Sequence, residues 1–160
     1  MTSNLRIGFG VDYHQIQKGN SMILGGIKID CGYSILAHSD GDIILHSICD
    51  ALLGAASIGD LGTVFKEDES TENISSSDLL NQVLNQLSEV SYQIVNLDIT
   101  YVGEVPRISK YREKILSNLS KLMNLNEEVL SVKSTTTDKL GAIGNREGIA
   151  CYCSALIQKK

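Results

Sequence analysis

Residues 42–57 read DIILHSICDALLGAAS. Apolar side chains recur in this stretch at spacings of three and four, which is the period of an α-helix with one buried face. Asp42 stands near the start, where a carboxylate favours the positive end of a helix. We therefore predict a largely buried helix over residues 42–57, which Gly59-Asp60-Leu61-Gly62 then ends. Its apolar positions are Ile43, Ile44, Leu45, Ile48, Leu52 and Leu53.

Strand and helix patterns alternate on both sides of this helix. The alternation predicts an α/β (α+β) fold of one domain over residues 1–160, with one mixed sheet and helices packed on one face. A sheet covered on one face leaves its other face open, which favours oligomerisation. We expect strands at 5–13, 92–103, 130–137 and 149–158, a short hairpin of 22–24 with 27–29, helices at 77–90 (N-cap Ser77) and 106–123 (Pro106 in its first turn), and loops at 66–76 and 141–148.

The bulk composition excludes several classes of protein. The chain has 160 residues, of which 42% are hydrophobic and 21% charged, as in ordinary globular domains. The net charge of −5 leaves no basic surface for nucleic acid. No apolar run approaches the roughly 18 residues that span a bilayer, and the first residues lack a secretory signal. We therefore expect a cytoplasmic protein without nucleic-acid or membrane partners, with its four cysteines as buried thiols.

The three histidines of the chain, His14, His38 and His46, all lie in its first third. Asp12 and His14 are two residues apart in an expected strand, so both side chains lie on one face; we place them at the C-terminal end of that strand. An Asp-x-His tripeptide alone is more often not a metal site. Two histidines and one carboxylate nevertheless suit zinc, and three protein ligands leave a fourth position open for Lewis-acid chemistry on a substrate oxygen.

His46 lies on the expected helix, four residues from Asp42 and from Asp50. One interpretation of this stripe is a solvated helix face. A buried stripe would instead need partners, because an unpaired buried charge is costly. A metal on His46, with Asp42 or Asp50 orienting the imidazole, would provide them.

Other polar segments are compatible with a phosphorylated ligand. His38 and Ser39 precede the helix N-terminus, where backbone N–H groups attract anions. The run Thr135-Thr136-Thr137 ends a strand beside Asp138; its hydroxyls can donate to phosphate oxygens and Asp138 can hold Mg²⁺, although threonines also simply favour strands. Asp60 is either an acceptor for sugar hydroxyls or an ordinary turn residue.

In their order along the chain, these segments resemble the 2-C-methyl-D-erythritol 2,4-cyclodiphosphate synthase family of the non-mevalonate isoprenoid pathway. The resemblance covers nearly the whole chain. It rests on Gly8-Phe9-Gly10-Val11-Asp12-Tyr13-His14, Leu36-Ala37-His38-Ser39-Asp40-Gly41-Asp42 with His46, Asp50-Ala51-Leu52-Leu53-Gly54-Ala55-Ala56, Gly59-Asp60-Leu61-Gly62, Thr135-Thr136-Thr137 and Glu147-Gly148-Ile149-Ala150.

The resemblance implies a homotrimer with active sites between subunits, and an enzyme that closes a cyclic diphosphate and releases CMP. It implies zinc on Asp12, His14 and His46, one per subunit, and magnesium or manganese with the substrate diphosphate, for which Asp138 is the candidate ligand. It implies that His38 and Thr136 stabilise the transition state. The remaining substrate contacts that it implies are Ser39, Asp60, Gly62, Phe65, Glu67, Glu69, Gly103, Pro106, Arg107, Ile108, Ser109, Thr135, Thr137 and Arg146.

The chain departs from the family pattern at a few positions. Asp138 replaces a usual glutamate, and residues 65–69 lack the usual proline. The resemblance places Ala142 and the shifted Arg146 beside a channel on the trimer axis, and it implies that isoprenoid diphosphates bind in that channel. Two other functions stay open: a zinc-dependent phosphohydrolase, and a non-catalytic trimeric protein that binds isoprenoid phosphates. If a longer leader is removed, the location would be the plastid stroma.

Overall fold

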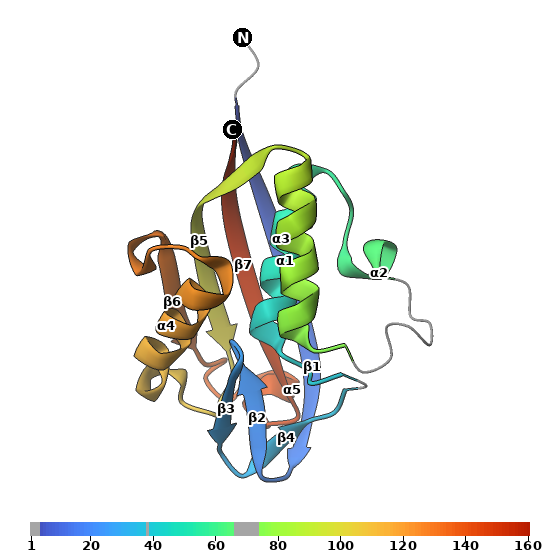
Figure 1. Cartoon of the computed structure of the whole chain (residues 1–160). Coiled ribbons are helices and arrows are strands. Elements are labelled where there is room, and N and C mark those ends of the chain that lie inside the picture. Colours follow the sequence, from blue (N-terminus) through green and yellow to red (C-terminus); the bar gives the residue numbers. More distant parts are fainter. Residues whose placement is uncertain (1–3, 38, 66–73) are drawn as a thin grey trace.

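One mixed sheet of five strands organises the chain (Figure 1). In this computed structural model, residues 4–37, 39–65 and 74–160 are described. The strand order is β4-β1-β7-β5-β6; β5 and β6 run parallel and the other neighbours antiparallel. The expected mixed sheet is therefore confirmed. The strands are β1 (Leu5–Lys18), β4 (Tyr33–Ile35), β5 (Tyr92–Val102), β6 (Leu130–Thr135) and β7 (Gly148–Lys159).

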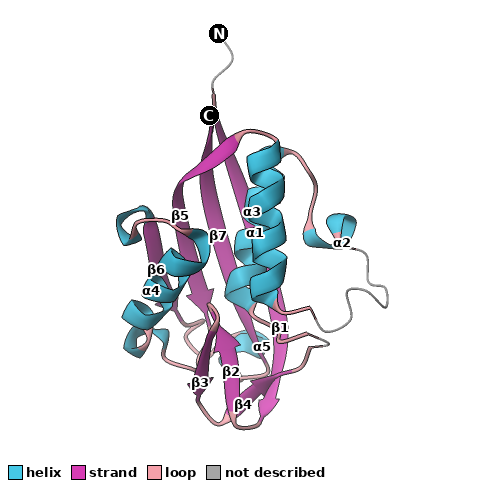
Figure 2. Ribbon diagram, in the orientation of Figure 1, coloured by secondary structure: helices cyan, strands magenta, loops and turns pink. Residues whose placement is uncertain are grey.

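Three long helices cover one face of this sheet (Figure 2). They are α1 (Ile43–Ala56), α3 (Ser76–Glu89) and α4 (Arg112–Met123). None of the helices in the described ranges is long and apolar enough to cross a membrane. The shorter elements are the hairpin β2 (Ser21–Leu24) with β3 (Ile27–Asp30), the helical turns α2 (Leu61–Val64) and α5 (Gly141–Gly144), and the 3-10 turns Ile108–Lys110 and Glu127–Val129.

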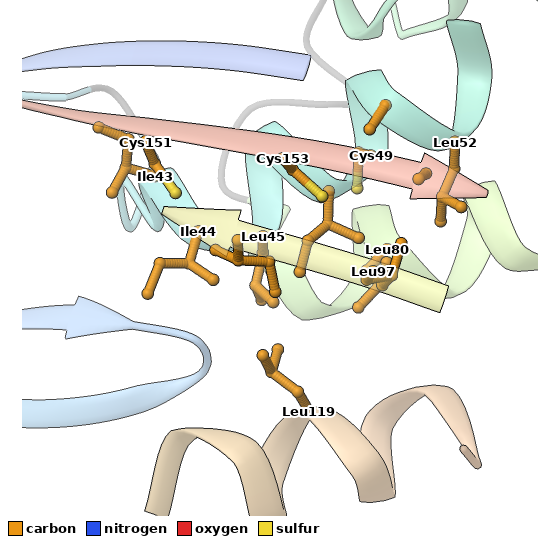
Figure 3. Packing of buried hydrophobic residues seen from close by; sticks show 14 of the residues in the cluster. Ile43, Ile44, Leu45, Cys49, Leu52, Leu80, Leu97, Leu119, Cys151 and Cys153 are labelled. Carbon is orange, nitrogen blue, oxygen red and sulfur yellow. The ribbon is translucent and has the colours of Figure 1, made fainter. Parts of the chain in front are cut away.

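The sides of the helices that face the sheet form one hydrophobic core (Figure 3). Leu45 and Leu52 of α1 and Leu97 of β5 belong to this core, and all three are fully buried. Cys151 and Cys153 lie on the inner side of β7 and are free, buried thiols, as expected. Cys49 is a third buried thiol, whereas Cys31 is only partly buried.

Asp42 fixes the start of α1 and the place of the β2–β3 hairpin. Its carboxylate accepts hydrogen bonds from the N–H groups of Ile44 and Leu45, which cap the helix, and from those of Gly25 (2.8 Å) and Gly26 (2.6 Å). Burial raises the pKa of Asp42 to about 6, against the opposite effect of these N–H groups. The hairpin turn depends on glycine because Gly25 and Gly26 both have positive φ.

Two glycines of β1 let α1 lie directly on the strand. A Cβ atom on Gly8 would stand 1.9 Å from the Ala51 oxygen, and one on Gly10 would stand 2.0 Å from the Ser47 oxygen. Any larger residue at either position therefore has to push α1 away from the sheet. This close packing decides which residues of the helix face which residues of the strand.

The opposite face of β1 carries exposed apolar side chains. Ile7 is 78% exposed and Phe9 62%, and Leu5 and Tyr13 are about half exposed. These residues occupy the odd positions of the strand, so they point away from α1. The open sheet face expected from the sequence is therefore present and strongly apolar at its β1 side.

Several expected boundaries were wrong. β1 continues to Lys18 because β4, which was not expected, pairs with its polar second half. Ser75 caps α3 in place of Ser77. Pro106 does not begin a helix: its peptide bond to Val105 is cis, the hydroxyl of Tyr101 holds the Val105 oxygen, and α4 starts only at Arg112. β6 stops at Thr135, and the loop at 141–148 contains α5.

The substitution Gly10→Ala tests the contact of α1 with β1. We expect it to lower the free energy of unfolding by about 1–3 kcal/mol, because overpacking displaces the helix. Gly54→Ala is the matched control, since a Cβ there meets nothing within 4 Å and alanine is the better helix former. It should raise the free energy of unfolding by about 0.5–1 kcal/mol. Urea denaturation measures both, and equal effects would contradict the close packing.

Candidate functional site

The strand β1 and the helix α1 bring Asp12, His14 and His46 together. His46 Nδ1 and His14 Nε2 each lie 3.1 Å from Asp12 Oδ2, and the three ligand atoms lie within 4.8 Å of one another. Asp12 and His14 share the strand face of Gly8 and Gly10, so they point towards α1. They lie in the interior of β1 and not at its C-terminal end, which corrects the expected position.

The donor set of this cluster fits a metal ion. His14 Nε2 is buried, and no hydrogen-bond partner for it occurs in the described part of the chain, because its approach to Asp12 lacks hydrogen-bond geometry. A buried nitrogen without a partner is costly unless something else binds its lone pair. Two imidazole nitrogens and one carboxylate oxygen that lie this close together are the kind of donor set that a metal ion binds.

The charges of the cluster stabilise one another. Burial acts to raise the pKa of Asp12, but the contacts with His14 and His46 lower it far below its usual range. Burial acts to lower the pKa of His46, but the hydrogen bond and the negative charge of Asp12 outweigh it and leave that pKa raised. Both shifts have the same cause, the attraction between the Asp12 carboxylate and the two imidazoles.

Asp42 and Asp50 do not orient the imidazole of His46, contrary to the sequence-based interpretation. The carboxylate of Asp42 accepts hydrogen bonds from four main-chain N–H groups. Asp50 accepts a hydrogen bond from the Leu61 N–H at 2.8 Å and so fixes the start of α2. Both are structural carboxylates of α1.

The second nitrogen of His46 contacts Ser76, which the sequence pattern predicts in the loop 66–76 and which is instead the first residue of α3. His46 Nε2 lies 2.8 Å from the hydroxyl of Ser76, which also bonds the carboxylate of Asp40. Ser76 is fully buried at the start of α3. In the sequence, Ser76 is one of three consecutive serines and Asp40 has the pattern of a turn residue. Neither pattern indicates a contact with His46.

A second group of expected site residues gathers where β5 and β6 end. The Gly103 N–H donates to the Thr135 oxygen, and the Lys139 N–H donates to Glu104, so the segment 103–109 lies against the segment 135–139. The hydroxyl of Thr136 accepts from the Asp138 N–H, and that of Thr137 donates to the Leu140 oxygen. Pro106 and Ile108 are buried here, whereas Arg107, Ser109, Thr135, Thr136 and Asp138 are exposed.

The remaining expected contacts lie outside both groups. Asp60 caps α2 through Thr63, with Gly62 inside that turn and Phe65 at its end. The Ser39 hydroxyl accepts from the Gly41 N–H. Arg146 adopts a positive φ, and its side chain helps to lower the pKa of Tyr33 together with Lys18. His38, Glu67 and Glu69 lie outside the described residues.

The two groups of site residues are separated across the sheet. Strand register places Tyr13 of β1, Ala150 of β7, Val102 of β5 and Thr135 of β6 in one line. Three strand spacings of about 4.8 Å put roughly 14 Å between Tyr13 and Thr135. The Asp12–His14–His46 cluster and the Thr135 segment of the same chain therefore lie at opposite sides of the sheet, three strands apart.

Known proteins match the chain over almost its whole length. Residues 5–158 match the model of the YgbB family. The 2-C-methyl-D-erythritol 2,4-cyclodiphosphate synthase of Leptospira interrogans is 44% identical over 158 residues, which cover 97% of this chain and 98% of that protein. The solved structure of IspF from Plasmodium falciparum in complex with CDP is 37% identical, covers 100% of this chain and 99% of that one, and has a TM-score of 0.88. The bifunctional IspDF from Campylobacter jejuni is 33% identical with a TM-score of 0.92; the match covers 98% of this chain and 42% of that one.

The raised pKa of His46 predicts how the metal-free protein responds to pH. Its folded-state pKa lies above the value of about 6.5 of an unfolded histidine, so its contribution to stability is fully present below about pH 6.5. That contribution is lost as the pH rises through the folded-state pKa. With a chelator present, the free energy of unfolding of the wild type should therefore fall more between about pH 6 and 8.5 than that of His46→Gln. Parallel urea curves at all pH values would contradict the ion pair.

Proposed function

The chain belongs to the YgbB family, and on that premise we propose that it converts 4-diphosphocytidyl-2-C-methyl-D-erythritol 2-phosphate to 2-C-methyl-D-erythritol 2,4-cyclodiphosphate in the non-mevalonate pathway. In this reaction an oxygen of the 2-phosphate attacks the β-phosphorus. The bond from the β-phosphorus to the oxygen bridging it to the α-phosphate breaks, and CMP leaves. The observation that carries the proposal is the converging Asp12–His14–His46 cluster within a match of residues 5–158.

Two metal ions complete the proposed site. Asp12 Oδ2, His14 Nε2 and His46 Nδ1 would hold one zinc ion per subunit, and Asp138 would contribute to a magnesium or manganese site at the substrate diphosphate. Bound there, the cations supply positive charge that offsets the repulsion between the two phosphate groups. The nucleophile is already an anion, so the protein needs no strong general base.

The residues of the chain then act mainly by positioning and by donating hydrogen bonds to phosphate oxygens. His38 and Thr136 are the proposed donors at the reacting phosphate, with Ser39, Thr135 and Thr137 beside them. The turn of α2 at Asp60 and Gly62 would hold the ribose. The segment 103–109 would hold the cytosine with main-chain groups. The hydroxyl of Tyr101 fixes this segment by donating to the Val105 oxygen.

A homotrimer with active sites between subunits agrees with two features of the chain. The roughly 14 Å between the metal cluster and the Thr135 segment is bridged if these groups come from neighbouring copies. The exposed apolar side chains of β1, above all Ile7 and Phe9, give the outer sheet face a surface to bury against such copies. We propose that this face lies at the centre of the trimer.

A product assay tests the proposed reaction. With zinc and Mg²⁺ present, phosphorus NMR should show CMP and a cyclic diphosphate in equal amounts. His46→Ala should lower the rate at least about 100-fold, because the cluster loses one of its three ligands. Gly54→Ala, which leaves the cluster intact, should keep the wild-type rate. A linear 2,4-bisphosphate product would instead indicate a phosphohydrolase, and metal binding without turnover would indicate a binding protein.

The outer face of β1 provides the test of the trimer. Ile7→Glu places a charge on the apolar face, and sedimentation should shift from a trimer towards a monomer, with loss of activity. Val90→Glu is the control, because Val90 is also exposed but ends α3 on the helix side of the molecule. A trimer that survives Ile7→Glu would show that this face is not the interface.

A further inference from the structure

A buried chain of hydrogen bonds runs from Asp40 through Ser76 to His46. It joins three separate parts of the fold: the loop before α1, the first residue of α3 and the first turn of α1. The Ser76 side chain has no exposed surface, so its hydroxyl bonds only within the protein. This chain reaches the Asp12–His14–His46 cluster from the side opposite to Asp12.

The hydrogen bonds of Asp40 decide which group donates and which accepts along this series of hydrogen bonds. Its Oδ2 accepts from the Ser76 N–H at 2.9 Å, and its Oδ1 accepts from the Asp42 N–H at 3.2 Å. Both oxygens therefore face donors, as suits an ionised carboxylate, which can only accept. The single hydroxyl proton of Ser76 must then point to Asp40.

The direction of that proton decides the state of His46. Because the Ser76 hydroxyl donates to Asp40, its oxygen accepts at the 2.8 Å contact, and His46 Nε2 carries the proton. With a proton held on Nε2, Nδ1 is the nitrogen that a metal can use: in this structure it donates to Asp12 Oδ2 at 3.1 Å, and loss of that proton frees its lone pair. That nitrogen faces the metal cluster.

We propose that Ser76, held by Asp40, is a positioning residue that fixes the tautomer and ring orientation of His46 so that Nδ1 is its metal-binding nitrogen. The inference rests on the metal site of the proposed function. Partners that bond the outer nitrogen of a ligating histidine commonly raise metal affinity about 10- to 100-fold. Here the partner belongs to α3, so the packing of α3 on α1 becomes a condition for metal binding.

Zinc affinity, measured by competition with a chromogenic chelator, tests this role. We expect Ser76→Ala to lower the affinity about 10- to 100-fold. Ser75→Ala is the matched control on the adjacent residue: it removes the α3 cap to the Asp78 N–H but does not touch His46, so the affinity should stay at the wild-type value. Ser76→Thr keeps the hydroxyl and should recover most of the affinity.

Asp40→Asn provides a second variant of nearly the same shape. Its amide can donate to the Ser76 hydroxyl, which reverses the chain and directs the serine proton to Nε2. Long-range ¹⁵N–¹H NMR of the zinc-loaded wild type should show the proton of His46 on Nε2, and Asp40→Asn should bind zinc about 10- to 100-fold more weakly. This arm applies even if Ser76→Ala does not fold.

The outcomes separate the inference from the proposed function. If the wild type binds no zinc, the metal site itself is wrong, and the inference falls with it. If the wild type binds zinc and Ser76→Ala and Asp40→Asn bind it equally well, only the positioning role is overturned. A proton found on His46 Nδ1 in the zinc-loaded protein would also overturn it.

Discussion

The contact between α1 and the glycine side of β1 is the constraint on which the rest of the site depends. Gly8 and Gly10 bring the helix backbone so close to the strand that a methyl group would not fit between them. Along the strand, the same face continues to Asp12 and His14, and along the helix the matching position is His46. A helix held further away by larger side chains would leave His46 out of reach of Asp12. The Asp12–His14–His46 cluster thus depends on backbone packing as much as on the chemistry of its three side chains.

Four aspartates near α1 show how similar residues acquire different roles from their surroundings. Asp12 pairs with two histidines and offers its oxygen to the cluster. Asp42 is fully buried and binds main-chain N–H groups of both the helix and the β2–β3 hairpin. Asp40 bonds Ser76, and Asp50 bonds α2. Each carboxylate thereby fixes one neighbouring element relative to α1, and these elements surround the site.

The sequence predicted what short-range patterns encode. The period of residues 42–57 gave α1 to within one residue at each end, and the Gly25-Gly26 pair gave the hairpin turn. The Asp12–His14–His46 cluster followed from strand alternation and from the resemblance of the ordered motifs. Other features depend on contacts between distant segments, which no local pattern contains. Ser76 becomes a partner of His46 only through the packing of α3 on α1. Pro106 lies in a turn in which the hydroxyl of Tyr101, from β5, donates to the oxygen of the preceding residue, Val105.

Together, β1 and α1 form one candidate metal site from Asp12, His14 and His46. The most direct test is an anomalous difference map at the zinc absorption edge, from a crystal of the protein grown with zinc. The account predicts one strong peak per chain within bonding distance of Asp12 Oδ2, His14 Nε2 and His46 Nδ1, at about 2.0–2.2 Å from each. No peak at this cluster, or a peak bound through His46 Nε2, would contradict it.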